Sequence, residues 1–166
     1  MRHAKIAAAA MAILVIAPHG AFADDEDSIA VAELGASGET ALNNGGGSAI
    51  GPTASIEWHV APDWLSIETG VSRFSGHGHA DWDADLLFKK PFQLTDKLEF
   101  MIGAGPSWSH GPEGDSYGME ASADFMLWPW DGSRLGFYAE PSYGYNFAHD
   151  HEQSLGFTVG LLFAIP

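Results

Sequence analysis

The chain has 166 residues, contains no cysteine, and has only seven lysines and arginines against 22 acidic residues. Without cysteine it can form no disulfide, so its fold must be stabilised by burial and hydrogen bonding alone. The net charge of -15 argues against nucleic acid as a partner, because lysine and arginine must replace the counterions of a nucleic-acid backbone. Beyond residue 23 there is also no apolar run of about 20 residues, the length that a membrane-spanning helix needs. Any membrane crossing must therefore be made by strands.

The first 23 residues have the pattern of a secretory signal peptide. A short basic stretch precedes an apolar run (6–18), and Ala21-Phe22-Ala23 then provides a small-x-small cleavage site. The alternative is a retained helical anchor, but the apolar run is too short to span a bilayer. We therefore expect an exported domain that comprises residues 24–166.

Period-two alternation of polar and apolar residues recurs from about residue 48 to the C-terminus, and no segment has a sustained helical period. This pattern is typical of β-strands. The candidate strands are 28–42, 48–60, 64–74, 79–92, 97–108, 117–130, 134–147 and 153–165.

The connections between these strands fall into two alternating classes. The tight turns are 61–63, 95–96 and 131–133, and the longer glycine- or histidine-rich loops are 43–47, 75–78, 109–116 and 148–152. Short turns at one end and long loops at the other, on an even number of strands, are typical of outer-membrane barrels. We predict an all-β fold, an eight-stranded antiparallel up-and-down transmembrane β-barrel, with both termini on the periplasmic side.

Each strand from the second onward has one apolar face and one face of small and acidic residues. A narrow eight-stranded barrel needs such an interior, because it has room only for packed side chains and one small ligand. On the apolar face, Arg73 and Lys90 lie near strand ends, where long side chains can reach lipid headgroups. Aromatic residues near the two ends predict two interface belts: Trp58, Trp64, Phe92, Phe100, Trp128 and Trp130 at one, and Phe74, Trp82, Trp108, Tyr145 and Phe147 at the other.

Two features depart from a regular barrel. Pro52, Pro106 and Pro141 fall inside predicted strands, where a missing N–H has no harmless edge to face, so we expect bulges there. The first candidate strand alternates weakly, which predicts that it enters the barrel only from about Glu33.

Three segments carry a resemblance to a known family: DLLFKKPF (85–92), FMLWPW (125–130) and HEQSLGFTVGLLFAIP (151–166). With the signal peptide and the alternating loops, the chain resembles a small porin-like outer-membrane β-barrel family of Gram-negative bacteria. The resemblance implies the fold, residence in the outer membrane among its lipids, and contact with the barrel insertion machinery during biogenesis. It implies no catalytic residue and no cofactor.

The inward face predicts an acidic lumen. The carboxylates assigned to it are Glu57, Glu68, Asp81, Asp83, Asp85, Glu99, Glu120, Asp124 and Glu140, with Lys89 and Arg134 as counter-charges. Neighbouring carboxylates on one face lie about 6 to 7 Å apart along a strand, so several cannot stay ionised without water, cations or protons. The lumen therefore either binds or passes small cations, or is a plugged interior whose acids pair with the two bases.

Histidines gather in the predicted long loops. His77, His79, His110, His149 and His151 alternate there with acidic residues, and imidazole with carboxylate suits zinc, nickel or copper. The spacing matches no fixed zinc signature, so exposed polar loop residues are the competing interpretation.

We expect a non-enzymatic barrel, and two other classes of function compete with it. A lipid-modifying enzyme could use His149, His151 and Ser154 with Asp150 or Glu152, although a triad is defined by geometry and not by proximity in sequence. A soluble periplasmic lipocalin-like barrel would bind a ligand inside. It requires an apolar interior and a polar exterior, so the polarity of the two faces discriminates it.

Overall fold

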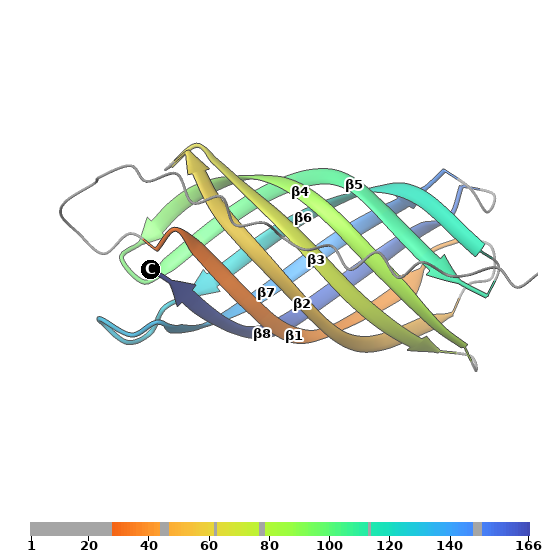
Figure 1. Cartoon of the computed structure of the whole chain (residues 1–166), viewed down its shortest axis with the longest axis horizontal. Coiled ribbons are helices and arrows are strands. Elements are labelled where there is room, and N and C mark those ends of the chain that lie inside the picture. The colour runs from red at the N-terminus through yellow and green to blue at the C-terminus, as the bar shows by residue number, and fades with distance from the viewer. Residues whose placement is uncertain (1–27, 44–46, 62, 77–78, 113, 148–150) are drawn as a thin grey trace, which may run out of the picture.

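A computed structural model describes residues 28–43, 47–61, 63–76, 79–112, 114–147 and 151–166, the side chains of residues 79 and 80 excepted. Eight strands form a closed antiparallel barrel in which each strand pairs with the next and the last pairs with the first (Figure 1). The predicted fold class is therefore confirmed. The strands are β1 (Ala30–Ala41), β2 (Ser48–Ala61), β3 (Leu65–Gly76), β4 (His79–Thr95), β5 (Leu98–Gly111), β6 (Gly114–Leu127), β7 (Leu135–Asn146) and β8 (Gln153–Ile165). The described residues contain no helix that is long and apolar enough to cross a membrane.

The two ends of the barrel are distinguished by the chain termini. Ala30 pairs with Ile165, so β1 starts and β8 ends at the same end, on the left in Figure 1. We call this the terminal end and the opposite one the distal end.

The predicted alternation of loop lengths is wrong. β5 and β6 stay paired as far as Gly111 and Gly114 at the distal end, so most of the predicted loop 109–116 belongs to a hairpin. At the terminal end, by contrast, the connection 128–134 is long. The reason is that backbone pairing does not require apolar side chains, so the β5–β6 ladder continues through polar pairs such as His110 with Asp115.

β1 belongs to the barrel along its whole length. It pairs with β2 and with β8 from Ala30 onward, which corrects the expectation that the barrel starts at Glu33. Weak alternation misleads here because β1 is rich in small residues, which fit either face of a sheet. Closure of the barrel also provides both edges of β1 with hydrogen-bond partners.

No bulge lies at the three strand prolines; the register shifts among the described pairs occur at His59/Ala61 and Gln93/Thr95. Glycines precede two of the prolines and leave room for the neighbouring strand. A Cβ on Gly51 would lie 1.8 Å from the Arg73 carbonyl oxygen, and one on Gly105 would lie 1.9 Å from that of Leu86. The neighbouring strand thus approaches closely beside Pro52 and Pro106.

The outer face of the barrel is apolar. Large exposed side chains on it include Leu34, Val71, Leu86, Phe88, Ile102, Phe137, Val159 and Leu161. This polarity contradicts the soluble lipocalin-like alternative, which requires polar residues outside. The guanidinium of Arg73 lies 5.8 Å from the ring centroid of Trp82, and the ammonium of Lys90 lies 5.3 Å from that of Phe92. The prediction that Phe74 belongs to an interface belt is wrong, because its side chain is buried and lines the lumen.

A cluster of apolar side chains fills the lumen near the terminal end, with Trp128 packed against it. Its buried members, which we call the apolar plug, are Val31, Met101, Met126, Tyr138 and Leu162. The sequence predicts a small polar interior and misses this plug. Two paired glycines make room for the Tyr138 ring, since a Cβ on Gly35 would lie 2.6 Å from its hydroxyl oxygen and one on Gly160 would lie 2.6 Å from its Cε1.

Candidate functional site

The barrel turns acidic side chains from seven of its strands inward. The predicted lumen carboxylates on β2 to β7 alternate with the exposed apolar residues, and the deepest of them, Glu57, Glu68, Asp124 and Glu140, are buried. β1 adds two that sequence reasoning missed, Glu33 and Glu39. The signal was present, because both alternate with the outward Leu34, but the weak apolar pattern of this strand hid its phase.

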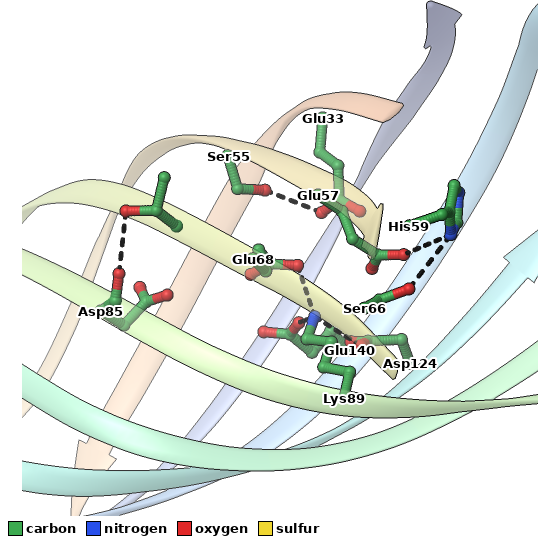
Figure 2. Close-up of polar contacts among 11 residues, drawn as sticks. Glu33, Ser55, Glu57, His59, Ser66, Glu68, Asp85, Lys89, Asp124 and Glu140 are labelled. Carbon is green, nitrogen blue, oxygen red and sulfur yellow. Dashed lines mark hydrogen bonds and ion pairs between the residues drawn. The ribbon is translucent and has the colours of Figure 1, made fainter. Parts of the chain in front are cut away.

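Lys89 on β4 is the centre of the first cluster in the lumen. Its side chain is 1% exposed and is surrounded by one carboxylate from each of three other strands. Its ammonium donates a hydrogen bond to Glu68 Oε2, lies 2.5 Å from Asp124 Oδ2 and donates to Glu140 Oε2 at 3.1 Å (Figure 2). We call these four residues the Lys89 cluster. It connects β3, β4, β6 and β7 through the barrel interior.

A second cluster lies beside it, made of Glu33, Glu57 and Glu68 (Figure 2). One carboxylate oxygen from each residue lies within 4.8 Å of those of the other two, and we call it the three-glutamate cluster. Ser55 orients Glu33 by donating a hydrogen bond to its Oε2 at 2.8 Å. His59 Nδ1 lies 3.6 Å from Glu57 Oε1 and 3.0 Å from the Ser66 hydroxyl.

The two clusters place more negative than positive charge in a buried space. Glu33, Glu57, Glu68, Asp124 and Glu140 are all at most 9% exposed, and Lys89 is the ammonium among them. Two unit charges 4.8 Å apart repel by about 3 kcal/mol at an effective dielectric constant of 20. Burial also removes the water that would otherwise stabilise a carboxylate. The arrangement therefore favours the entry of further positive charge.

Above the clusters the lumen widens toward the distal end. A cavity of about 700 Å³, the distal cavity, is lined by Glu39, Asp81, Asp83, Asp85 and Glu120 together with serines and glycines. A smaller void of about 60 Å³ shares Asp83, Asp85 and Glu120 with it and reaches Glu33 and Glu68. Most predicted lumen acids thus line one or both of these two neighbouring spaces.

The two predicted counter-charges have different positions. Lys89 lies in the lumen, as expected. Arg134 is exposed in the connection before β7, so its predicted role as a lumen base is wrong. Strand β7 begins at Leu135, one residue later than predicted, so Arg134 lies outside the strand. Glu99 is half-buried and paired in register with Gln93 near the terminal end, away from the distal cavity.

The structure does not bring the described loop histidines together. His110 is exposed and hydrogen-bonds Asp115 at 2.7 Å, whereas His151 stacks on Tyr145 with a centroid distance of 5.8 Å. His77, His149 and the side chain of His79 lie outside the described residues. In the described part of the chain, the side-chain groups with metal-ligand spacing consist of carboxylates alone. A histidine metal site therefore stays a prediction.

Among the described residues, those considered for lipid chemistry do not form a catalytic arrangement either. Ser154 is buried and lines the distal cavity, while His151 is exposed. Within the described ranges no hydrogen bond joins these two residues; His149 and Asp150 lie outside those ranges.

Comparisons with known proteins support the fold. No protein-family model and no curated protein sequence matches the chain. Among solved structures it is similar to the Neisserial surface protein A, with a TM-score of 0.70 and 13% identity over 83% of this chain and 98% of that one. A de novo designed transmembrane β-barrel gives 0.58 and 11%, covering 86% and 100%. The attachment invasion locus protein of Yersinia pestis gives 0.57 and 10%, covering 83% and 99%. The expected resemblance to small eight-stranded membrane barrels is thus confirmed at the level of the fold.

Proposed function

We propose that this protein is an integral outer-membrane β-barrel whose acidic lumen binds small cations that enter from the distal end. The observation that carries the proposal is the distal cavity, where Glu39, Asp81, Asp83, Asp85 and Glu120 line one space of about 700 Å³. A cavity with walls of one charge sign concentrates counter-ions. Small cations are the solutes that this lining favours.

Residence in the membrane is supported by the outer surface. Its side chains are apolar between two ends that carry aromatic residues, and Arg73 and Lys90 lie where they can reach headgroups. The closed ladder leaves no strand edge to be satisfied by water, which is the condition for β-structure in lipid. The predicted signal peptide and the fold similarity support the same compartment.

Binding is favoured over free passage because the lumen is closed below the cavity. Met101 and Leu162 are 0% exposed, and the apolar plug lies on the terminal side of the Lys89 cluster. A solute that crosses the barrel would have to displace both the apolar plug and the Lys89 cluster. Conduction is therefore the second candidate function, supported only by the acidic lining.

The proposal is tested by titrating Mn²⁺ into the protein in lipid vesicles and measuring the free ion by electron paramagnetic resonance. We expect weak binding that Na⁺ displaces and that falls several-fold in the triple variant D81N/D83N/D85N. The matched control D63N/D96N/D131N removes the same charge from turns at the terminal end and should bind as the wild type does. Equal losses in both variants would instead mean that cations respond only to net charge, and would refute a lumen site.

A further inference from the structure

The two buried clusters of the lumen are near copies of each other. In each, three carboxylates present oxygens within 4.8 Å of one another, and Glu68 belongs to both. In the Lys89 cluster an ammonium occupies the space between the carboxylates. The three-glutamate cluster keeps its oxygens within the same distance limit, but no lysine or arginine of the described residues forms an ion pair with Glu33 or Glu57.

We propose that the three-glutamate cluster is a binding site for one hard divalent cation, such as Ca²⁺, held by Glu33, Glu57 and Glu68. Such ions take carboxylate oxygens as ligands, and three glutamates supply them from three adjacent strands. Glu68 can serve both clusters, because a carboxylate has two oxygens and several lone pairs. One of them, Oε2, accepts the hydrogen bond from Lys89.

Unpartnered buried oxygens point independently to a cation. Glu57 is 0% exposed and Glu33 is 2% exposed. Within the described part of the chain, Glu33 Oε1 and both carboxylate oxygens of Glu57 have no hydrogen-bond partner, and the His59 Nδ1 atom lies 3.6 Å from Glu57 Oε1. Buried polar atoms are normally satisfied, so oxygens left without donors mark a place where a ligand or a proton belongs.

Two of the three glutamates also line a smaller void in the lumen. The void of about 60 Å³ is lined by Glu33 and Glu68 at its deep side and by Asp83, Asp85 and Glu120 where it meets the distal cavity. The inference rests on the proposed function to this extent, since the ion would enter through the same lumen. The two sites differ in kind: the distal cavity is wide and lined by polar side chains, whereas the cluster is buried and requires the ion to lose most of its water.

The experiment uses the same Mn²⁺ titration, now in high Na⁺, which displaces weakly bound ions. We expect the wild type to retain one tightly bound Mn²⁺ that Ca²⁺ displaces. Glu33→Gln and Glu57→Gln should each weaken it about tenfold or more, because losing even a supporting partner of a metal site usually costs 10- to 100-fold in affinity. The matched control is Glu120→Gln, which makes the same change in the distal cavity and should leave tight binding intact.

A second measurement begins with the wild type alone and adds one variant as a control. Ca²⁺ should raise the denaturant midpoint of the wild type relative to a chelator, since a ligand that binds only the folded state stabilises it. The same increment should be absent in Glu33→Gln.

Each outcome separates the two proposals. If the wild type shows weak binding but no tight binding, the divalent site is overturned, because protons would then neutralise the cluster. The proposal for the distal cavity would stand in that case. Tight binding that is lost equally in Glu120→Gln would also overturn it, by placing the ion in the distal cavity. Tight binding that survives D81N/D83N/D85N would support the buried site even where the weak site fails.

Discussion

The ammonium of Lys89 on β4 hydrogen-bonds the carboxylate of Glu140 on β7 at 3.1 Å, although these two strands do not pair with each other. The contact crosses the barrel interior, and Glu68 and Asp124 complete it from β3 and β6. One side chain thus joins four strands, which makes Lys89 the residue on which the interior charge balance depends most.

Replacing Lys89 with Met is expected to destabilise the barrel by about 3 to 5 kcal/mol, because buried carboxylates lose their counter-charge. The control is Lys97→Met, which breaks the exposed pair with Asp131 at 2.9 Å and should cost about 1 kcal/mol or less. Denaturant unfolding in lipid vesicles measures both. Similar costs for the two variants would contradict a structural role for the Lys89 cluster.

Gly35 and Gly38 lie on the same strand, β1, and their replacement with alanine is expected to have different effects on stability. A Cβ on Gly35 would lie 2.5 Å from the Val159 carbonyl oxygen and 2.6 Å from the Tyr138 hydroxyl, whereas one on Gly38 would meet only Ala49 O at 3.9 Å. Gly35→Ala should therefore destabilise by about 1 to 3 kcal/mol, the usual cost of overpacking. Gly38→Ala should be neutral or slightly stabilising. A tolerated Gly35→Ala, measured by the same unfolding titration, would show that Tyr138 does not fill this space.

Val159 tests whether the apolar outer face contacts lipid. Its side chain is exposed near the middle of β8, so Val159→Arg should destabilise the barrel by about 2 to 4 kcal/mol in a bilayer. Tyr117→Arg places the same charge on an exposed position near the distal end and should cost about 1 kcal/mol or less. If Val159→Arg proved harmless in vesicles, lipid contact at mid-barrel would be refuted.

The apolar plug predicts the electrical behaviour of the barrel. In planar bilayers the inserted wild type should show no conductance steps, because Met101, Met126 and Leu162 are shielded from water. Replacing these three residues with alanine should open cation-selective steps, and adding D81N/D83N/D85N should reduce the selectivity. Steps in the wild type would mean that the lumen opens and would favour conduction as the function.

Much of the fold could be predicted because each face of a strand meets one environment. Alternation along β8, from Leu155 to Ile165, assigns outward and inward residues without knowledge of any neighbour. The same rule placed Lys89 and the acids of β2 to β7 in the lumen. It failed for Glu33 and Glu39, because small residues on β1 leave its phase undetermined.

The loop lengths and the register at the strand prolines could not be predicted, because backbone pairing between strands determines both. The β5–β6 hairpin continues through polar residues, and the register is unshifted past Pro52 and Pro106, where the neighbouring strand approaches the preceding glycine. Neither fact is visible in one strand alone.

The sequence by itself determined a cysteine-free chain of eight amphipathic strands with an acidic interior. These properties follow from composition and from the period of two, which are local. Only the tertiary structure decided that Lys89 joins Glu68, Asp124 and Glu140, that Glu33 and Glu57 meet Glu68, and that Met101 and Leu162 pack together inside the barrel. The physical reason is that barrel closure and strand register bring together residues that are far apart in the chain. A buried cluster depends on their distances in space, which the sequence does not give.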